Sequence, residues 1–172
     1  MSQRLPVHIE PVGAADRGRE LHGQMPVSAF ERLGHWLHSH EGELDVSLHF
    51  GRGASGRRTL RAEVEGDLEL VCERCLSPFG LHLDLSVELT LVDSEAEAKT
   101  LPADAEPLVL SDTRSMHTTD MIEDDLILAL PVVPRCERAD CHAAVRVLDS
   151  EEAERDADTG RQRPFADLDP DA

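Results

Sequence analysis

The chain has 172 residues and a formal net charge of −18 at pH 7, and Lys99 is its only lysine. Non-specific nucleic-acid binding gains affinity from many Lys and Arg side chains that displace counterions, so this composition disfavours a general nucleic-acid coat. The sequence contains no run of about 18 apolar residues and no apolar signal-peptide core, so we expect a cytoplasmic protein that has no membrane partner.

The first expected element is an amphipathic helix over residues 27–38. Phe30, Leu33, Trp36 and Leu37 recur there at helical intervals, and Ser28 stands where it would cap the helix N-terminus. We expect this helix to cover one face of a sheet.

Three segments predict β-strands with one buried face. Residues 44–50, 60–72 and 81–91 each place an apolar side chain at every second position, which is the period of a strand. Gly66 marks a bend or bulge in the second segment. Because the connections are short, we predict an antiparallel β-meander over residues 44–91 with one solvent-exposed face.

The connection between the first two of these segments is basic. It contains no acidic residue between His49 and Ala62, and it lacks the glycine and lysine pattern of a nucleotide-binding loop. A solvated hairpin tip is one interpretation, and a contact with RNA phosphates is the other. The candidate RNA-binding residues are Arg52, Arg57, Arg58 and Arg61.

A second helix is predicted over residues 119–130, where it would also cover the sheet and where Pro131 would end it. Glu123, Asp124 and Asp125 lie in its first turns, where carboxylates complement the helix dipole. A cation site or acid–base chemistry is the alternative for these three residues. We also assign them as candidate residues for binding a basic protein partner.

The polar connection over residues 93–107 is not assigned any structure. Beyond about residue 148 the chain becomes strongly acidic, so we expect a single α+β domain over residues 1–148 and a disordered tail over residues 149–172. Phe165 and Leu168 lie three residues apart in that tail, within a short Pro-Phe-Ala segment. Such a motif can fold on binding to a partner, and the alternative is that Phe165 packs on its own domain.

Four cysteines form two pairs. Cys72 and Cys75 lie in the turn after the second strand, and Cys136 and Cys141 follow the second helix. Two residues between cysteines is a spacing at which both thiolates can bind one tetrahedral zinc ion at about 2.3 Å. We therefore consider structural zinc as the one candidate cofactor, with free thiols or a redox pair as alternatives. Three arginines beside the cysteines would offset the negative charge of a zinc–thiolate centre: Arg74, Arg135 and Arg138.

No pattern typical of a hydrolase nucleophile, a zinc protease or a kinase occurs in the sequence. We therefore predict a protein that is not an enzyme and that has no small-molecule substrate.

Residues 70–76, 122–134 and 163–168 resemble segments of the YceD family, the large ribosomal RNA subunit accumulation proteins, and residues 123–134 are the most specific of them. The resemblance implies a role in synthesis, processing or accumulation of 23S ribosomal RNA without known enzymatic activity. The sequence departs from relatives that finish with lysines, because it ends in Asp169, Pro170, Asp171 and Ala172.

Composition and resemblance together predict an accessory factor in large ribosomal subunit biogenesis. We expect it to bind a basic ribosomal or ribonucleolytic protein and to reach ribosomal RNA indirectly. The alternative is a direct RNA-binding module that uses the arginines of residues 52–61.

Overall fold

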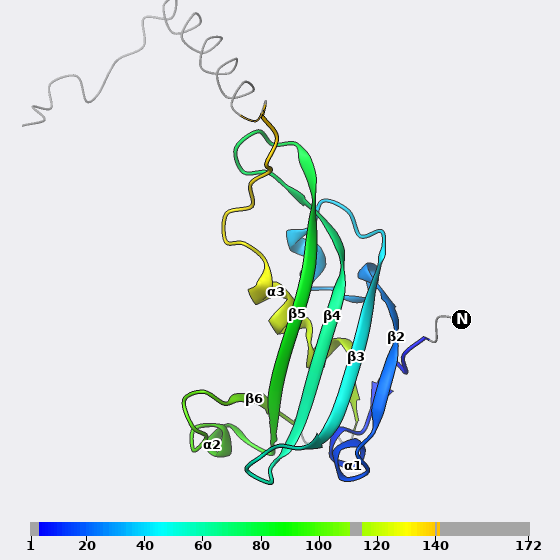
Figure 1. The fold of residues 1–172 in the computed structure, drawn as a ribbon, viewed down its shortest axis with the longest axis vertical. Helices are drawn as coiled ribbons and strands as arrows, with labels where there is room; N and C mark the ends of the chain where they lie inside the picture. Colours follow the sequence, from blue (N-terminus) through cyan, green and yellow to red (C-terminus); the bar gives the residue numbers. More distant parts are fainter. Residues whose placement is uncertain (1–3, 111–114, 140, 142–172) are drawn as a thin grey trace, which may run out of the picture.

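A computed structural model describes residues 4–110, 115–139 and 141. Its central element is a five-stranded sheet in the spatial order β2-β3-β4-β5-β6 (Figure 1). Neighbouring strands from β2 to β5 are antiparallel, whereas β6 runs parallel to β5. The α+β class and the antiparallel meander are confirmed. The strands are β2 (Glu20–Pro26), β3 (Glu43–Arg52), β4 (Arg58–Val71), β5 (Pro78–Val92) and β6 (Glu106–Val109).

The three alternating segments became β3, β4 and β5, the longest strands of the sheet. Their apolar positions share one face because side chains alternate along a strand. The register pairs buried positions across the sheet, with Val46 opposite Val64 and Leu60 opposite Leu89. The opposite face is polar and exposed. The most deeply buried strand residues are Leu44, Val46, Leu48, Leu60, Ala62, Val64, Leu70 and Val92.

Two strands of the sheet were not predicted. In β2, Gly23 interrupts the apolar alternation, and β6 begins with Glu106 and Pro107 inside the connection that was left unassigned. That connection also contains a short helix, α2 (Glu95–Ala98), in which the Ser94 hydroxyl accepts a hydrogen bond from the Glu97 backbone N–H. A minor sheet pairs β1 (His8–Ile9) with β7 (Met116–His117).

The predicted helix over residues 27–38 is wrong. The structure has two short 3-10 helices instead, η1 (Val27–Ala29) and η2 (Leu33–Trp36), separated by an extended Phe30, and no side chain caps η1. The physical reason is tertiary: Glu123 accepts hydrogen bonds from the backbone N–H groups of Arg32 and Leu33. An α-helix would have used those groups for its own ladder.

The second predicted helix is shorter than expected and broken. A 3-10 turn, η3 (Thr119–Met121), precedes α3 (Glu123–Ala129), and Ile122 between them has non-helical angles. The helix α3 contacts both η2 and β5, so it covers the apolar face of the sheet as predicted. An additional helix, α1 (Pro11–Asp16), packs on β3 and β4 and was not predicted. Among the described residues, no helix is long and apolar enough to cross a membrane.

Gly66 allows the β3 backbone to cross close to β4. A Cβ atom at this position would lie 2.6 Å from Leu44 Cδ2 and 3.2 Å from the carbonyl oxygen of Glu43. We expect Gly66→Ala to lower the free energy of unfolding by about 1–3 kcal/mol, because the new methyl group would press against the β3 backbone, which cannot move away as easily as a side chain can. Gly80→Ala in β5 is the matched control, since nothing lies within 4 Å of its Cβ position. Equal urea midpoints for the two variants would contradict this explanation.

Candidate functional site

The turn between β4 and β5 positions the first cysteine pair. The Cys72 backbone N–H donates to the carbonyl oxygen of Ser77 at 3.0 Å, and the Leu76 N–H donates to that of Cys72 at 2.9 Å. Leu76 adopts a left-handed conformation with φ of 54°, which completes the tight turn. Both thiol groups of the Cys72 and Cys75 pair therefore come from one short, hydrogen-bonded loop.

The segment after α3 returns the second cysteine pair to this turn. The carbonyl oxygen of Pro134 accepts a hydrogen bond from the Glu73 backbone N–H at 2.9 Å. This contact attaches residues 134–141, the C-terminal arm, to the end of the sheet. Cys136 is half-buried and Cys141 is buried. The Cys141 N–H donates to the carbonyl oxygen of Arg138, which turns the arm back toward the loop.

All four sulfur atoms meet in one cluster, within 4.8 Å of one another. The Cys72–Cys141 sulfurs are 3.8 Å apart and the Cys75–Cys136 sulfurs are 3.6 Å apart. A tetrahedron with zinc–sulfur bonds of about 2.3 Å has edges of about 3.8 Å. A disulfide would instead need about 2.05 Å. The donor set therefore fits one tetrahedral metal ion, and the distances agree with free thiols rather than a bonded pair.

Hydrogen-bond donors around the cluster favour thiolates. The Cys136 backbone N–H donates to Cys72 Sγ at 3.3 Å and is the main cause that lowers the pKa of Cys72 to about 6. The pKa of Cys75 is also lowered, mainly by the Ser77 backbone N–H and further by Arg138, whose Nη2 lies 3.3 Å from Cys75 Sγ. A thiolate is the form that binds metal. Burial has the opposite effect on Cys141 and raises its pKa.

Each arginine of the basic segment is paired with a carboxylate of the chain. Asp16 of α1 bonds both Arg52 and Arg58, with nitrogen–oxygen distances of 2.9 Å. The Arg58 guanidinium is the main cause that lowers the pKa of Asp16. The remaining two arginines also have acidic neighbours, with Arg57 bonded to Glu97 at 3.0 Å and Arg61 to Glu63 at 3.2 Å. The sequence analysis identified the arginines but not these partners, of which Asp16 and Glu97 come from distant segments and Glu63 lies two residues after Arg61 on the same strand.

The three acidic residues of α3 have different environments. Glu123 is only 4% exposed and bonds Arg32 as well as two backbone N–H groups, so it holds η2 in place and is not a free surface carboxylate. Its assignment as a partner contact stays a prediction, and its carboxylate already has partners within the chain. Asp124 is exposed and pairs with Arg32 at 2.6 Å. Asp125 is half-buried, and burial together with the nearby Glu106 carboxylate raises its pKa to about 6. Phe165 and Leu168 lie outside the described residues.

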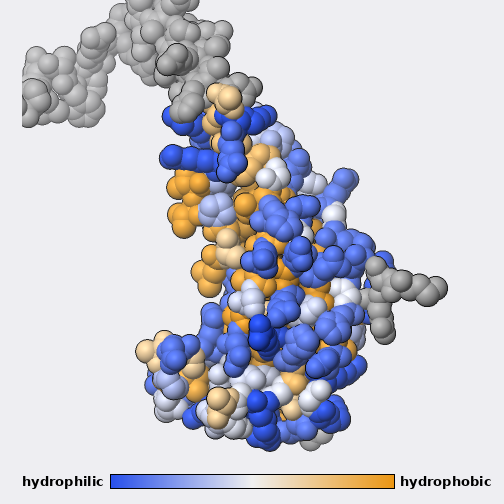
Figure 2. Space-filling model, in the orientation of Figure 1, coloured by the Kyte–Doolittle hydropathy of each residue, from blue (hydrophilic) through white to orange (hydrophobic). Residues whose placement is uncertain are grey.

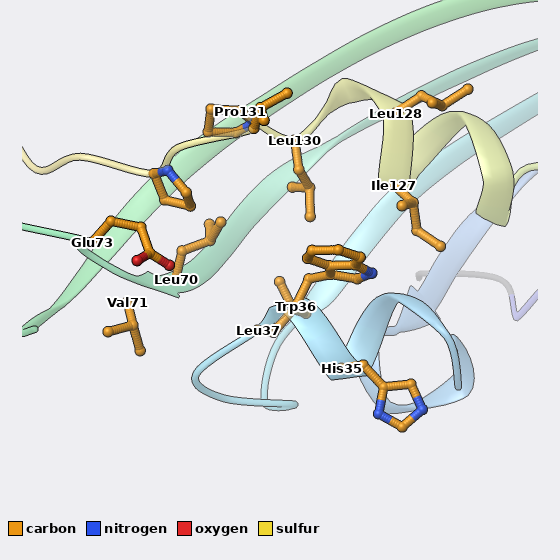
Figure 3. A pocket seen from close by; sticks show the side chains of 12 residues that line it. His35, Trp36, Leu37, Leu70, Val71, Glu73, Ile127, Leu128, Leu130 and Pro131 are labelled. Carbon is orange, nitrogen blue, oxygen red and sulfur yellow. The ribbon is translucent and has the colours of Figure 1, made fainter.

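An apolar groove beside α3 was not predicted. It encloses a cavity of about 440 Å³ whose walls come from η2, the end of β4, α3 and the segment after α3 (Figure 3). Trp36, expected in the core, is 62% exposed at this groove, and Leu128 is 76% exposed. Figure 2 shows hydrophobic side chains gathered over this side of the molecule amid hydrophilic surface. Trp36 is the last residue of η2, and Leu33 at its start is buried, so the sequence pattern alone did not separate the two.

Comparisons with known proteins agree on one family. The model for the large ribosomal RNA subunit accumulation protein YceD matches residues 60–170. A protein of that description from Haemophilus influenzae is 26% identical over 143 residues, which covers 83% of this chain and 82% of the relative. No solved structure matches the chain. The matched span contains all four cysteines, α3 and most of the central sheet.

Proposed function

The chain belongs to the YceD family of large ribosomal RNA subunit accumulation proteins. We propose that it supports the synthesis, processing or accumulation of 23S ribosomal RNA by binding a basic protein. The partner is a ribosomal or ribonucleolytic protein, and the chain acts as a cytoplasmic accessory factor without catalysis of its own. Direct binding to RNA through the arginines of residues 52–61 is the second candidate function.

The observation that carries the proposal is the charge of the exposed sheet face. Asp45, Glu65 and Asp84 lie directly opposite one another on β3, β4 and β5, and all three are exposed. Like charges at facing positions oppose sheet formation. The basic side chain beside this row is His82, 3.7 Å from Glu65, and its pKa is raised mainly by its hydrogen bond to Asp67 and further by Glu65 and Asp84. A negative surface attracts cationic proteins and repels phosphates. The sheet face therefore suits a basic protein better than RNA.

The ion pairs of the arginines also disfavour RNA binding. A phosphate group that approached Arg58 would have to displace the two-oxygen contact with Asp16, and at Arg57 it would compete with Glu97. The net charge of −18 adds long-range repulsion. RNA binding through this segment would therefore gain little from each arginine.

The cysteine cluster has a structural role in this proposal, with one zinc ion bound by Cys72, Cys75, Cys136 and Cys141. When bound, zinc supplies four metal–thiolate bonds that join the β4–β5 turn to the C-terminal arm. The Arg138 guanidinium beside Cys75 offsets part of the resulting negative charge. The chain between the two cysteine pairs includes α3 and the wall of the groove, so the cluster helps to hold both in position.

Binding measurements distinguish the two functions. We expect the purified protein to bind proteins extracted from large ribosomal subunits and to show no measurable affinity for a 23S ribosomal RNA fragment at low salt. An RNA-binding module would instead bind at low salt and lose affinity steeply as salt rises. Fluorescence anisotropy of labelled RNA measures the affinity for RNA, and anisotropy of the labelled protein measures its binding to the extracted proteins.

Two double variants serve as matched controls. The combination Arg57→Ala and Arg58→Ala should leave binding to the extracted proteins unchanged, whereas Glu65→Gln and Asp84→Asn should weaken it several-fold. Tight RNA binding that the arginine variant abolishes would refute the proposal in favour of the second function.

A further inference from the structure

The groove beside α3 presents apolar side chains that folding leaves uncovered. Trp36 projects from η2 toward Ile127 and Leu130, and Leu70 of β4 lies at the base of the same hollow (Figure 3). At the rim, Val132 is 99% exposed. Clustered apolar exposure of this kind, surrounded by polar surface, is typical of a protein-binding site.

An acidic hollow adjoins the groove on the other side of α3. It has a volume of about 410 Å³, and Ile127 and Leu128 line both hollows. The acidic hollow adds four carboxylates to these two apolar residues: Glu106, Asp120, Asp124 and Asp125.

The charge in this hollow is poorly compensated. Asp124 has Arg32 as its partner, but the charged neighbours of Asp125 are Glu106 and Asp124. Burial and these two acids raise the pKa of Asp125 to about 6. A cation placed here would relieve the repulsion between the carboxylates, so the hollow favours Lys or Arg from another molecule.

We propose that the groove and the acidic hollow together bind one amphipathic, basic helix of a partner protein. Its apolar side chains fill the groove against Trp36 and Leu128, and its Lys or Arg side chains reach Asp125 and Glu106. Helix-in-groove binding uses such a stripe of apolar anchors at helical spacing. This inference rests on the proposed function for the class of partner, and it adds the surface and the form of the bound segment.

Charge excludes two other occupants. The C-terminal residues 149–172 contain Phe165 and Leu168, but Asp and Glu outnumber Arg there, so this segment would be repelled by the acidic hollow. A second copy of the chain carries the same net charge of −18. A basic segment from another protein is the occupant that matches both the apolar and the acidic parts.

Trp36 provides a direct readout, because it is the only tryptophan of the chain and it lines the groove. The probe is a synthetic helix of roughly five turns, about 18 residues, with Leu on one face and Lys on the other. We expect it to shift the Trp36 emission to shorter wavelength in full-length protein. Peptides with Leu replaced by Ser, or Lys replaced by Glu, should bind at least tenfold more weakly.

Two pairs of variants locate the site. Leu128→Asp should weaken peptide binding at least tenfold, while Val7→Asp, at an exposed apolar residue outside the groove, should not. The double variant Glu106→Gln and Asp125→Asn should weaken binding several-fold and flatten its salt dependence. Glu10→Gln combined with Glu41→Gln, at two exposed acidic residues outside the groove, the acidic hollow and the proposed sheet face, is the matched control for charge and should leave peptide binding unchanged.

Several results would overturn the inference. These are the absence of an emission shift with the Leu–Lys peptide, equal binding by the Leu128→Asp and Val7→Asp variants, and an emission maximum that changes with protein concentration, which indicates a second copy. A red shift caused by Phe165→Ser in the free protein would show that the chain's own tail fills the groove. If Leu128→Asp still binds extracted ribosomal proteins as the wild type does, the groove proposal fails and the proposed function stands.

Discussion

Cys75→Ser is expected to remove zinc from the protein and to lower its melting temperature by roughly 10 °C. Metal affinity for a structural site appears as folding free energy, and a chain of this length shifts by about 2–4 °C per kcal/mol. Cys75 is only half-buried, so replacing its sulfur with oxygen has little effect on packing. Native mass spectrometry should find one zinc per wild-type chain and none per variant chain.

The loss of stability in Cys75→Ser should be local as well as global. The C-terminal arm is attached to the turn by the Glu73 to Pro134 hydrogen bond and by the sulfur cluster, so the Glu73 amide should exchange faster with solvent in Cys75→Ser. Amides in the middle of β4 exchange through global unfolding, so they should lose protection only by the drop in global stability, whereas the Glu73 amide should exchange through local opening of the arm. Hydrogen exchange measured by NMR resolves these two regions.

Ser77→Ala is the control for the turn itself. The Ser77 hydroxyl makes only a long contact, 3.4 Å, with the Cys75 carbonyl oxygen, so this variant should keep its zinc and its melting temperature. Treating the wild type with a strong chelator should reproduce the effect of Cys75→Ser. A wild-type protein that contains no metal and melts at the same temperature before and after added zinc would rule out the zinc proposal.

Glu123→Ala is expected to lower the free energy of unfolding by about 3 kcal/mol or more. The buried carboxylate accepts two backbone N–H groups, at 2.7 Å from Arg32 and 3.1 Å from Leu33, and also the Arg32 Nε at 3.0 Å. Removing it leaves the buried Leu33 N–H without an acceptor, which costs the desolvation of that group. It also removes the two part-buried hydrogen bonds and the ion pair with Arg32. Urea unfolding followed by circular dichroism measures the change.

Asp124→Ala is the matched control, since it also removes a carboxylate that bonds Arg32. That pair is exposed to solvent, so its loss should cost less than about 1 kcal/mol. Glu123→Gln keeps an oxygen acceptor for the backbone N–H groups but loses the charge. Its loss in free energy of unfolding should therefore lie between those of Glu123→Ala and Asp124→Ala. Similar costs for Glu123→Ala and Asp124→Ala would mean that the buried hydrogen bonds do not hold η2 in place.

The central sheet could be predicted from local sequence. Residues 44–50, 60–72 and 81–91 became β3, β4 and β5 because strict alternation of apolar and polar side chains is satisfied only by a strand with one buried face. The first cysteine pair was correctly placed in the turn between β4 and β5 for the same reason. The resemblance to the YceD family depended on short segments whose order and spacing the sequence already contained.

The helices and the surfaces depended on contacts between distant residues. The helical spacing of apolar residues over 27–38 predicted one helix. Glu123, some ninety residues away, instead accepts hydrogen bonds from the backbone N–H groups of Arg32 and Leu33, and the segment forms two 3-10 helices. Local propensity is a weak constraint that one buried carboxylate can override. Trp36 ends the second of these helices and is exposed at the groove, a position that the helical spacing did not predict.

The sequence alone determined an acidic protein with an alternating β framework and two cysteine pairs of suitable spacing. Only the tertiary structure decided that the two pairs meet within 4.8 Å, that Asp16 pairs with both Arg52 and Arg58, and that α3 divides an apolar groove from an acidic hollow. The physical reason is that side-chain alternation is encoded between neighbours along the chain. Ion pairs, metal ligands and grooves are made by residues that folding brings together from far apart.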